Sequence, residues 1–217
     1  MSDDTDSWAK ARADMVATQL KARGIADKRV LEAMGKIPRH LFVPEDMQPL
    51  AYDDGALPIG EGQTISQPYI VARMLELLSL KRRDRVLEVG TGSGYGAAVL
   101  GHLVERVVTM ERLPHLARAA RGRFSNLDMD NVTVITGDGT LGYPLKAPYD
   151  AILVSAGGPS VPKALTDQLA PGGRLMIPVG AAEFLQNLLL IERHGAELRT
   201  TVHEAVRFVP LIGEQGW

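Results

Sequence analysis

The chain has 217 residues, of which 45% are apolar, so it can bury a substantial core and falls within the size range of one ordinary domain. Its formal net charge of -2 provides no positive surplus to hold phosphate backbones or anionic lipid, so we expect neither nucleic acid nor a membrane as a partner. The absence of cysteine excludes disulfides and thiolate nucleophiles and fits a reducing compartment. The first residues are acidic, unlike a signal peptide, and no apolar run approaches the roughly 20 residues of a membrane span. We therefore expect a soluble cytoplasmic protein.

The N-terminal part of the chain predicts three helices. Apolar residues recur at helical spacing from Trp8 to Arg23, and Gly24 follows where a helix C-terminus favours a left-handed residue. Asp27 can cap a second helix, which must end before Pro38. Pro68 to Leu80 predicts a third helix with a proline in its first turn.

The segment from Ala51 to Gln67 separates the second helix from the third. It contains more prolines and glycines than a regular element tolerates, so we predict one long irregular loop. Loops of this length are often functional.

After residue 80, short apolar runs alternate with helical segments. We predict strands at Arg85–Val89, Arg106–Met110, Val132–Thr136, Ala151–Ser155 and Arg174–Val179, and helices after Gly94, Leu113 and Val161. This alternation implies a parallel sheet covered by helices on both faces. Leu188–Glu192 and Val206–Leu211 predict two further strands without a crossover helix between them, so an antiparallel edge should complete the sheet.

The domain organisation follows from these elements. We see no internal repeat and expect one domain over residues 1–217. Residues 1–7 are expected to be disordered, 8–80 to form a helical N-terminal cap with the loop, and 81–217 to form a Rossmann-like core.

A glycine-rich segment marks the candidate ligand site. The strand ending at Val89 runs into Gly90-Thr91-Gly92-Ser93-Gly94, and the residues after it are apolar at helical spacing. Glycines let the backbone approach a ligand closely or adopt positive φ, and the next helix offers free N–H groups at its N-terminus. The segment predicts a ligand site in a nucleotide-type fold. Because residues 92–97 also satisfy the dinucleotide pattern, NAD stays open as an alternative, as does a purely structural turn.

Three acidic residues lie around this loop in the sequence. Glu111 ends the second strand about 20 residues beyond the loop, where a carboxylate can accept hydrogen bonds from both ribose hydroxyls. Asp138 ends the third strand and could accept from the amine of adenine, although an aspartate between glycines is more often an ordinary turn. Glu88 lies in an apolar strand, where burial is costly without a partner, so we expect it to face the ligand or the loop amides. No lysine or arginine lies between Val86 and Leu103, which favours a cofactor without phosphates.

Two segments, GEGQTISQPY at residues 60–69 and LEVGTGSGY at residues 87–95, closely resemble the protein-L-isoaspartate O-methyltransferases. The similarity extends over nearly the whole chain. Further matching segments are PRH at 38–40, FVP at 42–44, AY at 51–52 with Asp54, LPI at 57–59, GDG at 137–139, APYD at 147–150, GGRL at 172–175, PVG at 178–180 and VRFVPL at 206–211. The glycine loop is generic to methyltransferases, whereas Gln63–Gln67 and Phe208–Leu211 are specific to this family.

The resemblance implies a fold and an activity. The fold is the Rossmann-like methyltransferase fold, an α/β architecture with a doubly wound, mostly parallel sheet, N-terminal helices and an antiparallel C-terminal edge. The cofactor is S-adenosyl-L-methionine, and the reaction is methyl transfer to the free carboxylate of L-isoaspartyl residues. In the family, the methyl ester collapses to a succinimide that hydrolyses partly to aspartate, which initiates repair. The implied partners are isoaspartyl-containing proteins and peptides, and we take a monomer as the default.

The same resemblance assigns the site residues. Ser66 is the catalytic residue. The cofactor-binding residues are Gln63, Thr64, Ile65, Glu88, Gly90, Gly92, Gly94, Glu111, Asp138 and Gly139. We further hypothesise that Ala51–Gln67 and Val206–Leu211 form the two walls of a substrate cleft, with Leu57, Ile59, Tyr69, Val209 and Pro210 as substrate-binding residues. A backbone edge at Val209 could bind an extended peptide through main-chain contacts. No metal is expected. From the residues alone, Ser66 could instead cap the helix that starts at Pro68, although the capping-box partner three residues on is a tyrosine.

The chain departs from the family pattern at two places. Gly96 stands where bacterial relatives usually carry a bulkier residue such as glutamine. The residues VSAGG at 154–158, with Ser155-Ala156-Gly157 at their centre, replace a more usual threonine-alanine-alanine run. Both departures concern details of the pocket.

The expected chemistry needs no general base, because a carboxylate with a pKa near 4 is already ionised at neutral pH. Holding the acceptor oxygen, the methyl carbon and the sulfur in line can supply most of the acceleration. None of the five histidines pairs with a carboxylate at metal-ligand spacing. The alternatives are a methyltransferase of a small molecule and a catalytically silent cofactor-binding adaptor, both disfavoured by the Gln63–Gln67 match. An NAD-dependent oxidoreductase ranks last.

Overall fold

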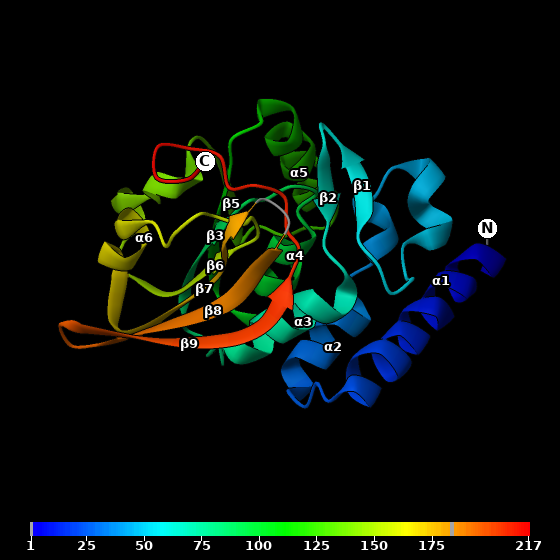
Figure 1. The fold of residues 1–217 in the computed structure, drawn as a ribbon. Coiled ribbons are helices and arrows are strands. Elements are labelled where there is room, and N and C mark those ends of the chain that lie inside the picture. The colour runs from blue at the N-terminus through cyan, green and yellow to red at the C-terminus, as the bar shows by residue number, and fades with distance from the viewer. Residues whose placement is uncertain (1, 183–184) are drawn as a thin grey trace.

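A seven-stranded sheet forms the centre of the molecule (Figure 1). The computed structural model describes residues 2–182 and 185–217. The strands are β3 (Arg85–Val89), β4 (Arg106–Glu111), β5 (Val132–Thr136), β6 (Tyr149–Val154), β7 (Leu169–Ala182), β8 (Leu185–His194) and β9 (Glu197–Val206). Their order is β5-β4-β3-β6-β7-β8-β9, with parallel pairing from β5 to β7 and antiparallel pairing of β8 with both neighbours. The predicted α/β fold with a mostly parallel sheet and an antiparallel C-terminal edge is confirmed.

The α-helices cover the sheet and its N-terminal side. They are α1 (Ser2–Asp14), α2 (Lys28–Lys36), α3 (Pro68–Leu77), α4 (Tyr95–Leu103), α5 (Pro114–Asn126) and α6 (Lys163–Asp167). α1 continues through a π-helical and a 3₁₀ stretch to Gly24, whose φ of 95° ends the helix as predicted. Asp27 caps α2, because its side chain accepts hydrogen bonds from the N–H groups of Arg29 and Val30. None of the helices described is both long and apolar enough to cross a membrane.

The first helix begins earlier than predicted. It starts at Ser2 instead of Trp8, so residues 2–7 belong to this helix. The expected disorder of residues 1–7 stays a prediction. An acidic sequence is favourable at a helix N-terminus, where the backbone carries a partial positive charge. The acidic residues near the N-terminus therefore suit the start of a helix.

Each face of the sheet has its own hydrophobic core, because successive side chains of a strand point to opposite faces. On one face, Val86 and Val107 pack with apolar residues of α2, α3, α4 and α5. On the other face, Leu87 and Met110 pack with Leu165 of α6. The helices on both faces confirm the doubly wound architecture.

The order of the strands places a ligand site at the end of β3. β4 and β5 lie on one side of β3, and β6 and β7 lie on the other. In open α/β sheets, ligands bind outside the carboxyl ends of the strands where the order reverses in this way. The glycine loop directly follows Val89, the last residue of β3.

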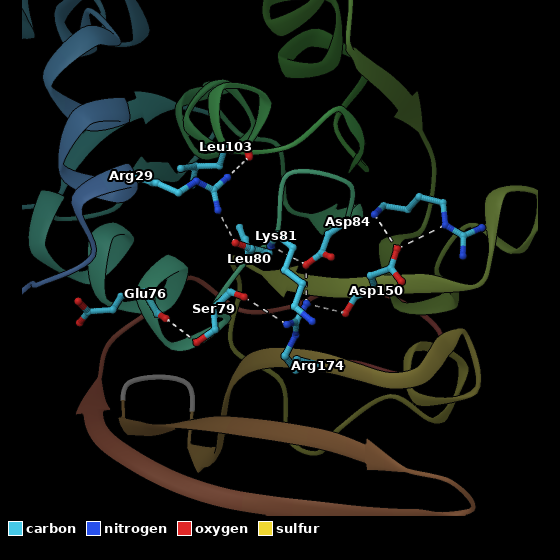
Figure 2. A network of polar contacts seen from close by, with 10 residues as sticks. Arg29, Glu76, Ser79, Leu80, Lys81, Asp84, Leu103, Asp150 and Arg174 are labelled. Atoms are coloured by element: carbon cyan, nitrogen blue, oxygen red, sulfur yellow. Dashed lines mark hydrogen bonds and ion pairs between the residues drawn. The ribbon is translucent and has the colours of Figure 1, made fainter.

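A polar network lies at the amino ends of the central strands, opposite the glycine loop (Figure 2). Arg174 of β7 donates to Asp84, just before β3, with a distance of 2.5 Å between Nη2 and Oδ2. Arg29 of α2 donates to the carbonyl of Leu80, with a distance of 2.5 Å from Nη1, and to the carbonyl of Leu103. The network joins α2, the end of α3 and the starts of the central strands, far from the glycine loop.

The segment from Ala51 to Gln67 is not one irregular loop, so that prediction was wrong. It contains a two-stranded antiparallel hairpin of β1 (Leu57–Gly60) and β2 (Gln63–Ile65). Gly60, Glu61 and Gly62 form its turn, with φ values of 88°, 53° and 68°. The glycines that indicated a loop serve this left-handed turn.

The last strand was also placed wrongly. The prediction was Val206–Leu211, but β9 runs over Glu197–Val206 and residues 207–211 leave the sheet. β9 is a polar, mostly exposed edge strand, so it lacks the apolar alternation by which strands are recognised. The apolar run after it lies against the end of β6, where Gly157 N–H donates to the carbonyl of Val209.

Candidate functional site

A cavity opens at the carboxyl ends of β3, β4 and β6, where the topology predicts a site. This glycine-loop cavity is lined by residues 63–66, 71, 74, 88–93, 95–96, 110–112, 139, 153, 155–156 and 209–212. The lining therefore combines the glycine loop with the end of the β1–β2 hairpin and the segment after β9. Of the predicted site residues, it includes Gln63, Thr64, Ile65, Ser66, Glu88, Gly90, Gly92, Glu111, Gly139, Val209 and Pro210.

The glycine loop adopts a conformation that only glycine takes without strain. Gly90, Gly92 and Gly94 have φ values of 93°, 52° and 93°. The loop is tied to β4, because the N–H of Gly90 donates to the carbonyl of Met110 over 2.9 Å. The backbone thus forms one wall of the cavity without intervening side chains at these positions.

Glu111 is buried at the end of β4 and faces this loop, with 6% of its surface exposed. Its Oε2 accepts from the N–H of Gly92 over 2.8 Å, and its Oε1 accepts from the N–H of Leu113 over 3.0 Å. A carboxylate has about four lone-pair sites, so two remain for other donors. The residue can therefore hold the loop and accept from the hydroxyls of a ligand at the same time.

Glu88 lies behind the loop and lines the cavity from β3, with 1% of its surface exposed. Its Oε2 accepts from the hydroxyl of Thr109 over 2.6 Å, and that hydroxyl also contacts the hydroxyl of Thr91 over 2.6 Å. Burial raises the pKa of Glu88 to about 8, opposed by the Thr109 hydrogen bond and assisted by the nearby Glu111. A positively charged ligand in this cavity would favour the ionised form of Glu88.

Asp138 does not line the cavity. Its Oδ1 accepts from the N–H and the hydroxyl of Thr140 over 2.8 and 2.7 Å, and its Oδ2 accepts from the N–H of Glu214 over 2.8 Å. These hydrogen bonds with the protein lower the pKa of Asp138, although burial acts in the opposite direction. The ordinary turn that the sequence also allowed is present, and it anchors the segment near the C-terminus.

Four other predicted residues also lie outside the cavity. Gly94 serves the fold, since a Cβ there would lie 2.9 Å from Cζ of Phe124 in α5. Leu57 and Ile59 belong to β1. The Tyr69 ring lies under the guanidinium of Arg23, with Cζ at 3.7 Å from its centroid. Whether a residue lines the cavity depends on how distant segments pack, which the sequence pattern does not contain.

A second depression adjoins the first. This hairpin groove is lined by residues 54–56, 64, 66–67, 70, 155, 185 and 205–209. It shares Thr64, Ser66, Ser155 and Val209 with the glycine-loop cavity. A molecule in the groove can therefore meet a molecule in the cavity at these four residues.

Ser66 lies at this junction and is not the helix cap that the sequence allowed. The N-cap of α3 is Gln67, and no side-chain hydrogen bond caps this helix. The carbonyl of Ser66 accepts from Nη2 of Arg39 over 2.8 Å, which fixes its backbone. Its hydroxyl makes no hydrogen bond with the part of the protein that the structure describes.

Near Val209, fewer main-chain hydrogen-bonding groups are free to bind a peptide than we expected. The carbonyl of Val209 accepts from the N–H of Gly157 over 2.8 Å. The N–H of Phe208 donates to Oε1 of Gln186 over 2.8 Å. The expected binding of an extended peptide at Val209 thus loses one of its main-chain acceptors to the fold.

Ser155 also lies at the junction of the cavity and the groove. From the sequence, we identified it only as a departure from the family pattern. It follows β6, which pairs directly with β3 in parallel. The carboxyl ends of parallel neighbours meet at one edge of the sheet, and this rule would have placed Ser155 beside the glycine loop. Its N–H donates to the carbonyl of Val89 over 2.8 Å.

Comparison with known proteins agrees with this geometry. A family model of protein-L-isoaspartate(D-aspartate) O-methyltransferases matches residues 11–216. Protein-L-isoaspartate O-methyltransferase 2 of Pelobacter propionicus is 57% identical to this chain, over 94% of the chain and 91% of the relative. The protein-L-isoaspartate O-methyltransferase of Methanoculleus marisnigri is 53% identical, over 99% of the chain and 97% of the relative.

Solved structures give the same result. A structure named protein-L-isoaspartate O-methyltransferase superposes with a TM-score of 0.86 at 30% identity and covers 94% of this chain and 67% of its own. A Plasmodium falciparum structure, described as a protein of this family in complex with S-adenosyl-L-homocysteine, has a TM-score of 0.80 at 27% identity and covers 93% and 98% of the two chains. With a family model over most of its length and relatives above half identity, this chain belongs to the protein-L-isoaspartate(D-aspartate) O-methyltransferase family.

Proposed function

We propose that this protein transfers the methyl group of S-adenosyl-L-methionine to the free carboxylate of L-isoaspartyl residues in damaged proteins and peptides, which initiates their repair. The observation that carries the proposal is the pair of adjoining depressions, one on the glycine loop and one beside the hairpin, which share Ser66. The first suits a compact cofactor and the second an extended acceptor. Membership in the family is the basis for naming the cofactor as S-adenosyl-L-methionine and the acceptor as an isoaspartyl residue.

The lining of the glycine-loop cavity fits S-adenosyl-L-methionine. Glu111 retains acceptor capacity for ribose hydroxyls, and the positive charge of a sulfonium would favour the ionised form of the buried Glu88. No lysine or arginine lies between residues 86 and 103, so the glycine loop itself carries no charge to neutralise a pyrophosphate, and the cation of the cavity lining is Arg112, after β4. We assign cofactor binding to Gln63, Thr64, Ile65, Glu88, Gly90, Gly92, Glu111 and Gly139, which line the cavity, and a supporting role to Gly94 and Asp138.

When bound, the cofactor supplies an electrophilic methyl group on a sulfonium. The protein has to bring the acceptor carboxylate to this group in line and to exclude water. We assign the orientation of the carboxylate to the hydroxyl of Ser66, because this hydroxyl lies at the junction and is not used by the fold. Val209 and Pro210 would contact the acceptor directly, whereas Leu57, Ile59 and Tyr69 would shape the hairpin behind it.

No general base is needed for this reaction. The acceptor carboxylate is ionised at neutral pH, given an ordinary pKa near 4. None of the residues lining the cavity or the groove is a histidine. Turnover at saturating cofactor should therefore vary little between pH 6 and 8.

The test is a methylation assay on two peptides that differ only in an L-isoaspartyl or L-aspartyl linkage. Initial rates should count transferred methyl groups, including released methanol, because the product ester decomposes. We expect methylation of the isoaspartyl peptide alone. Equal methylation of both peptides would refute the repair function and favour another methyl acceptor.

We also propose that the enzyme acts in the cytoplasm, as a monomer, on isoaspartyl-containing proteins. The cysteine-free composition fits a reducing compartment. Cell fractionation with a specific antibody tests the location, and light scattering of the purified protein tests the oligomeric state. Recovery outside the cytoplasmic fraction, or a dimer mass, would overturn the respective part.

A further inference from the structure

The buried side chain of Arg39 contacts both the segment that carries Ser66 and the helix that follows the glycine loop. Arg39 has 0% of its surface exposed and lies in a 3₁₀ turn after α2. Its Nε donates to the carbonyl of Ala51 over 2.7 Å, and its Nη2 donates to the carbonyl of Ser66 over 2.8 Å. One guanidinium therefore holds both ends of the segment that carries the β1–β2 hairpin.

The same guanidinium contacts the helix that follows the glycine loop. Its Cζ lies 4.8 Å from the ring centroid of Tyr95, the first residue of α4. Tyr95 is buried and lines the glycine-loop cavity. The ring of Phe42, from the same 3₁₀ turn as Arg39, meets Tyr95 edge to face at 5.6 Å. Arg39 thus stands between the Ser66 segment and the glycine-loop helix.

Burial of a guanidinium is costly, and an apolar side chain of similar volume usually stabilises a fold as well or better. Burial lowers the pKa of Arg39. Among the residues that the structure describes, its guanidinium contacts two neutral carbonyls and an aromatic ring and pairs with no carboxylate. The planar fork of arginine can bond two carbonyls in a fixed geometry, which the rotatable ammonium of lysine does not impose. The arrangement therefore favours a role in positioning over a role in stability.

We propose that Arg39 is a positioning residue for methyl transfer. It holds the Ser66 backbone at a fixed distance from the glycine-loop helix and so sets the place of the Ser66 hydroxyl relative to the cofactor cavity. The proposal rests on the function assigned above to Ser66. In-line transfer is sensitive to geometry, since a misplacement of about 1 Å can cost about 100-fold in rate.

The test uses Arg39→Lys and Arg39→Met, with Arg174→Lys as the matched control. Arg174 is also a largely buried guanidinium, but it lies in the network at the amino ends of the central strands. We expect kcat on the isoaspartyl peptide to fall about 10- to 100-fold in Arg39→Lys and further in Arg39→Met, with little change in KM or in the calorimetric Kd for S-adenosyl-L-methionine. Arg174→Lys should lose thermal stability and keep the wild-type kcat.

A double-mutant cycle separates positioning from general loss of structure. If Arg39 acts through Ser66, Arg39→Lys should have no further effect on kcat in the Ser66→Ala background. An additive loss in that background would overturn the proposal, as would a wild-type kcat in Arg39→Lys or an equal loss in Arg174→Lys. Methylation of the isoaspartyl peptide by the wild-type protein tests the proposed function independently. A wild-type rate in Ser66→Ala would refute both the role of Ser66 and the positioning through it, while leaving the methyltransferase activity in place.

Discussion

Ser66 can be tested separately from the fold, because its hydroxyl lies at the junction of cavity and groove and does not cap α3. We expect Ser66→Ala to keep the thermal stability and cofactor affinity of the wild type and to lose most of its turnover. Ser66→Thr, which keeps a hydroxyl, should retain more activity than the alanine variant. Calorimetry and initial rates measure the two properties. A loss of cofactor affinity equal to the loss of turnover would assign Ser66 to the cofactor instead of the acceptor.

Glu111 should contribute through its charge. Its two carboxylate oxygens hold the N–H groups of Gly92 and Leu113, so Glu111→Gln replaces one acceptor by a donor that faces an N–H. We expect the affinity for S-adenosyl-L-methionine to weaken by about 1.5 to 3 kcal/mol, the contribution of a hydrogen bond to a charged group. Glu105→Gln, at an exposed ion pair with Arg82, is the control and should leave the affinity unchanged. If calorimetry gives the same Kd for Glu111→Gln and wild type, the ribose binds elsewhere.

Glu88 should make the stability of the protein depend on pH. Its pKa is about 8 in the folded protein and 4.5 for an unperturbed glutamate, so between these values the folded state keeps a proton that the unfolded state releases. The free energy of unfolding should therefore fall as pH rises from about 5 to 8, by at most about 1.4 kcal/mol per pH unit, and this contribution is fully present only below the unfolded pKa.

Glu88→Gln should remove that dependence, because glutamine can still accept from Thr109 but does not titrate. Urea unfolding of both proteins at several pH values between 5 and 8 measures the difference. Parallel pH profiles for the two proteins would show that Glu88 is ionised in the folded state.

At the level of elements, two helical glycines should respond in opposite ways to the same substitution. A Cβ at Gly96 in α4 would lie 2.3 Å from Oε1 of Glu88, a buried oxygen on a side chain fixed by Thr109. A Cβ at Gly122 in α5 meets nothing within 4 Å. We expect Gly96→Ala to destabilise the protein and weaken cofactor binding, whereas Gly122→Ala should stabilise it by about 0.5 to 1 kcal/mol through helix propensity. Thermal unfolding and calorimetry measure both, and stabilisation by Gly96→Ala would mean that Glu88 can move aside freely.

Gly96 also shows why a comparison of residue types could not describe the pocket. The family usually carries a bulkier residue at this position, and from the sequence the effect on the pocket was open. In the structure, the space beside Gly96 is filled by the carboxylate of Glu88 from the neighbouring strand. The contact between Gly96 and Glu88 links α4 to β3, so the hydrophobic periodicity within either element does not reveal it.

Strands with a clear apolar pattern were predicted more accurately than strands with a weak one. β3 and β5, whose apolar runs end at glycines or charged residues, have the predicted bounds. The β1–β2 hairpin was missed because strands of 4 and 3 residues are too short to show alternation. The junction residue Ser155 was missed as a site because its position depends on strand order, which a local pattern does not contain.

At the scale of the whole molecule, we propose that both ends of the chain fold as one unit with the sheet. One hydrophobic core contains residues of α2 and α3 together with Val86 and Val107 of the sheet, and Trp8 packs against it. The ring of Trp8 stacks on His40 at 4.7 Å, and Nε1 of Trp217 donates to the carbonyl of Gly157 over 3.0 Å. The two tryptophans thus report on opposite ends of the sequence.

The fluorescence of either tryptophan should therefore report the same single cooperative unfolding transition. In Trp8→Phe and Trp217→Phe, the fluorescence of the remaining tryptophan should follow the same urea transition as the circular dichroism of that variant. Separate midpoints for the Trp8 signal would show that residues 8–80 unfold as an independent domain.

The division of the site into two depressions also bears on how such an enzyme can be altered by evolution or by design. The residues that line the groove alone, which are 54–56, 67, 70, 185 and 205–208, lie outside the parallel strands that carry the glycine loop. On the proposed function, we expect exchanges in these segments to change which methyl acceptor binds and to leave the binding of S-adenosyl-L-methionine intact. We therefore propose that the parallel strands and β2 keep the cofactor site constant, whereas the segment before β1, the start of α3 and the neighbouring ends of β8 and β9 determine which acceptor binds.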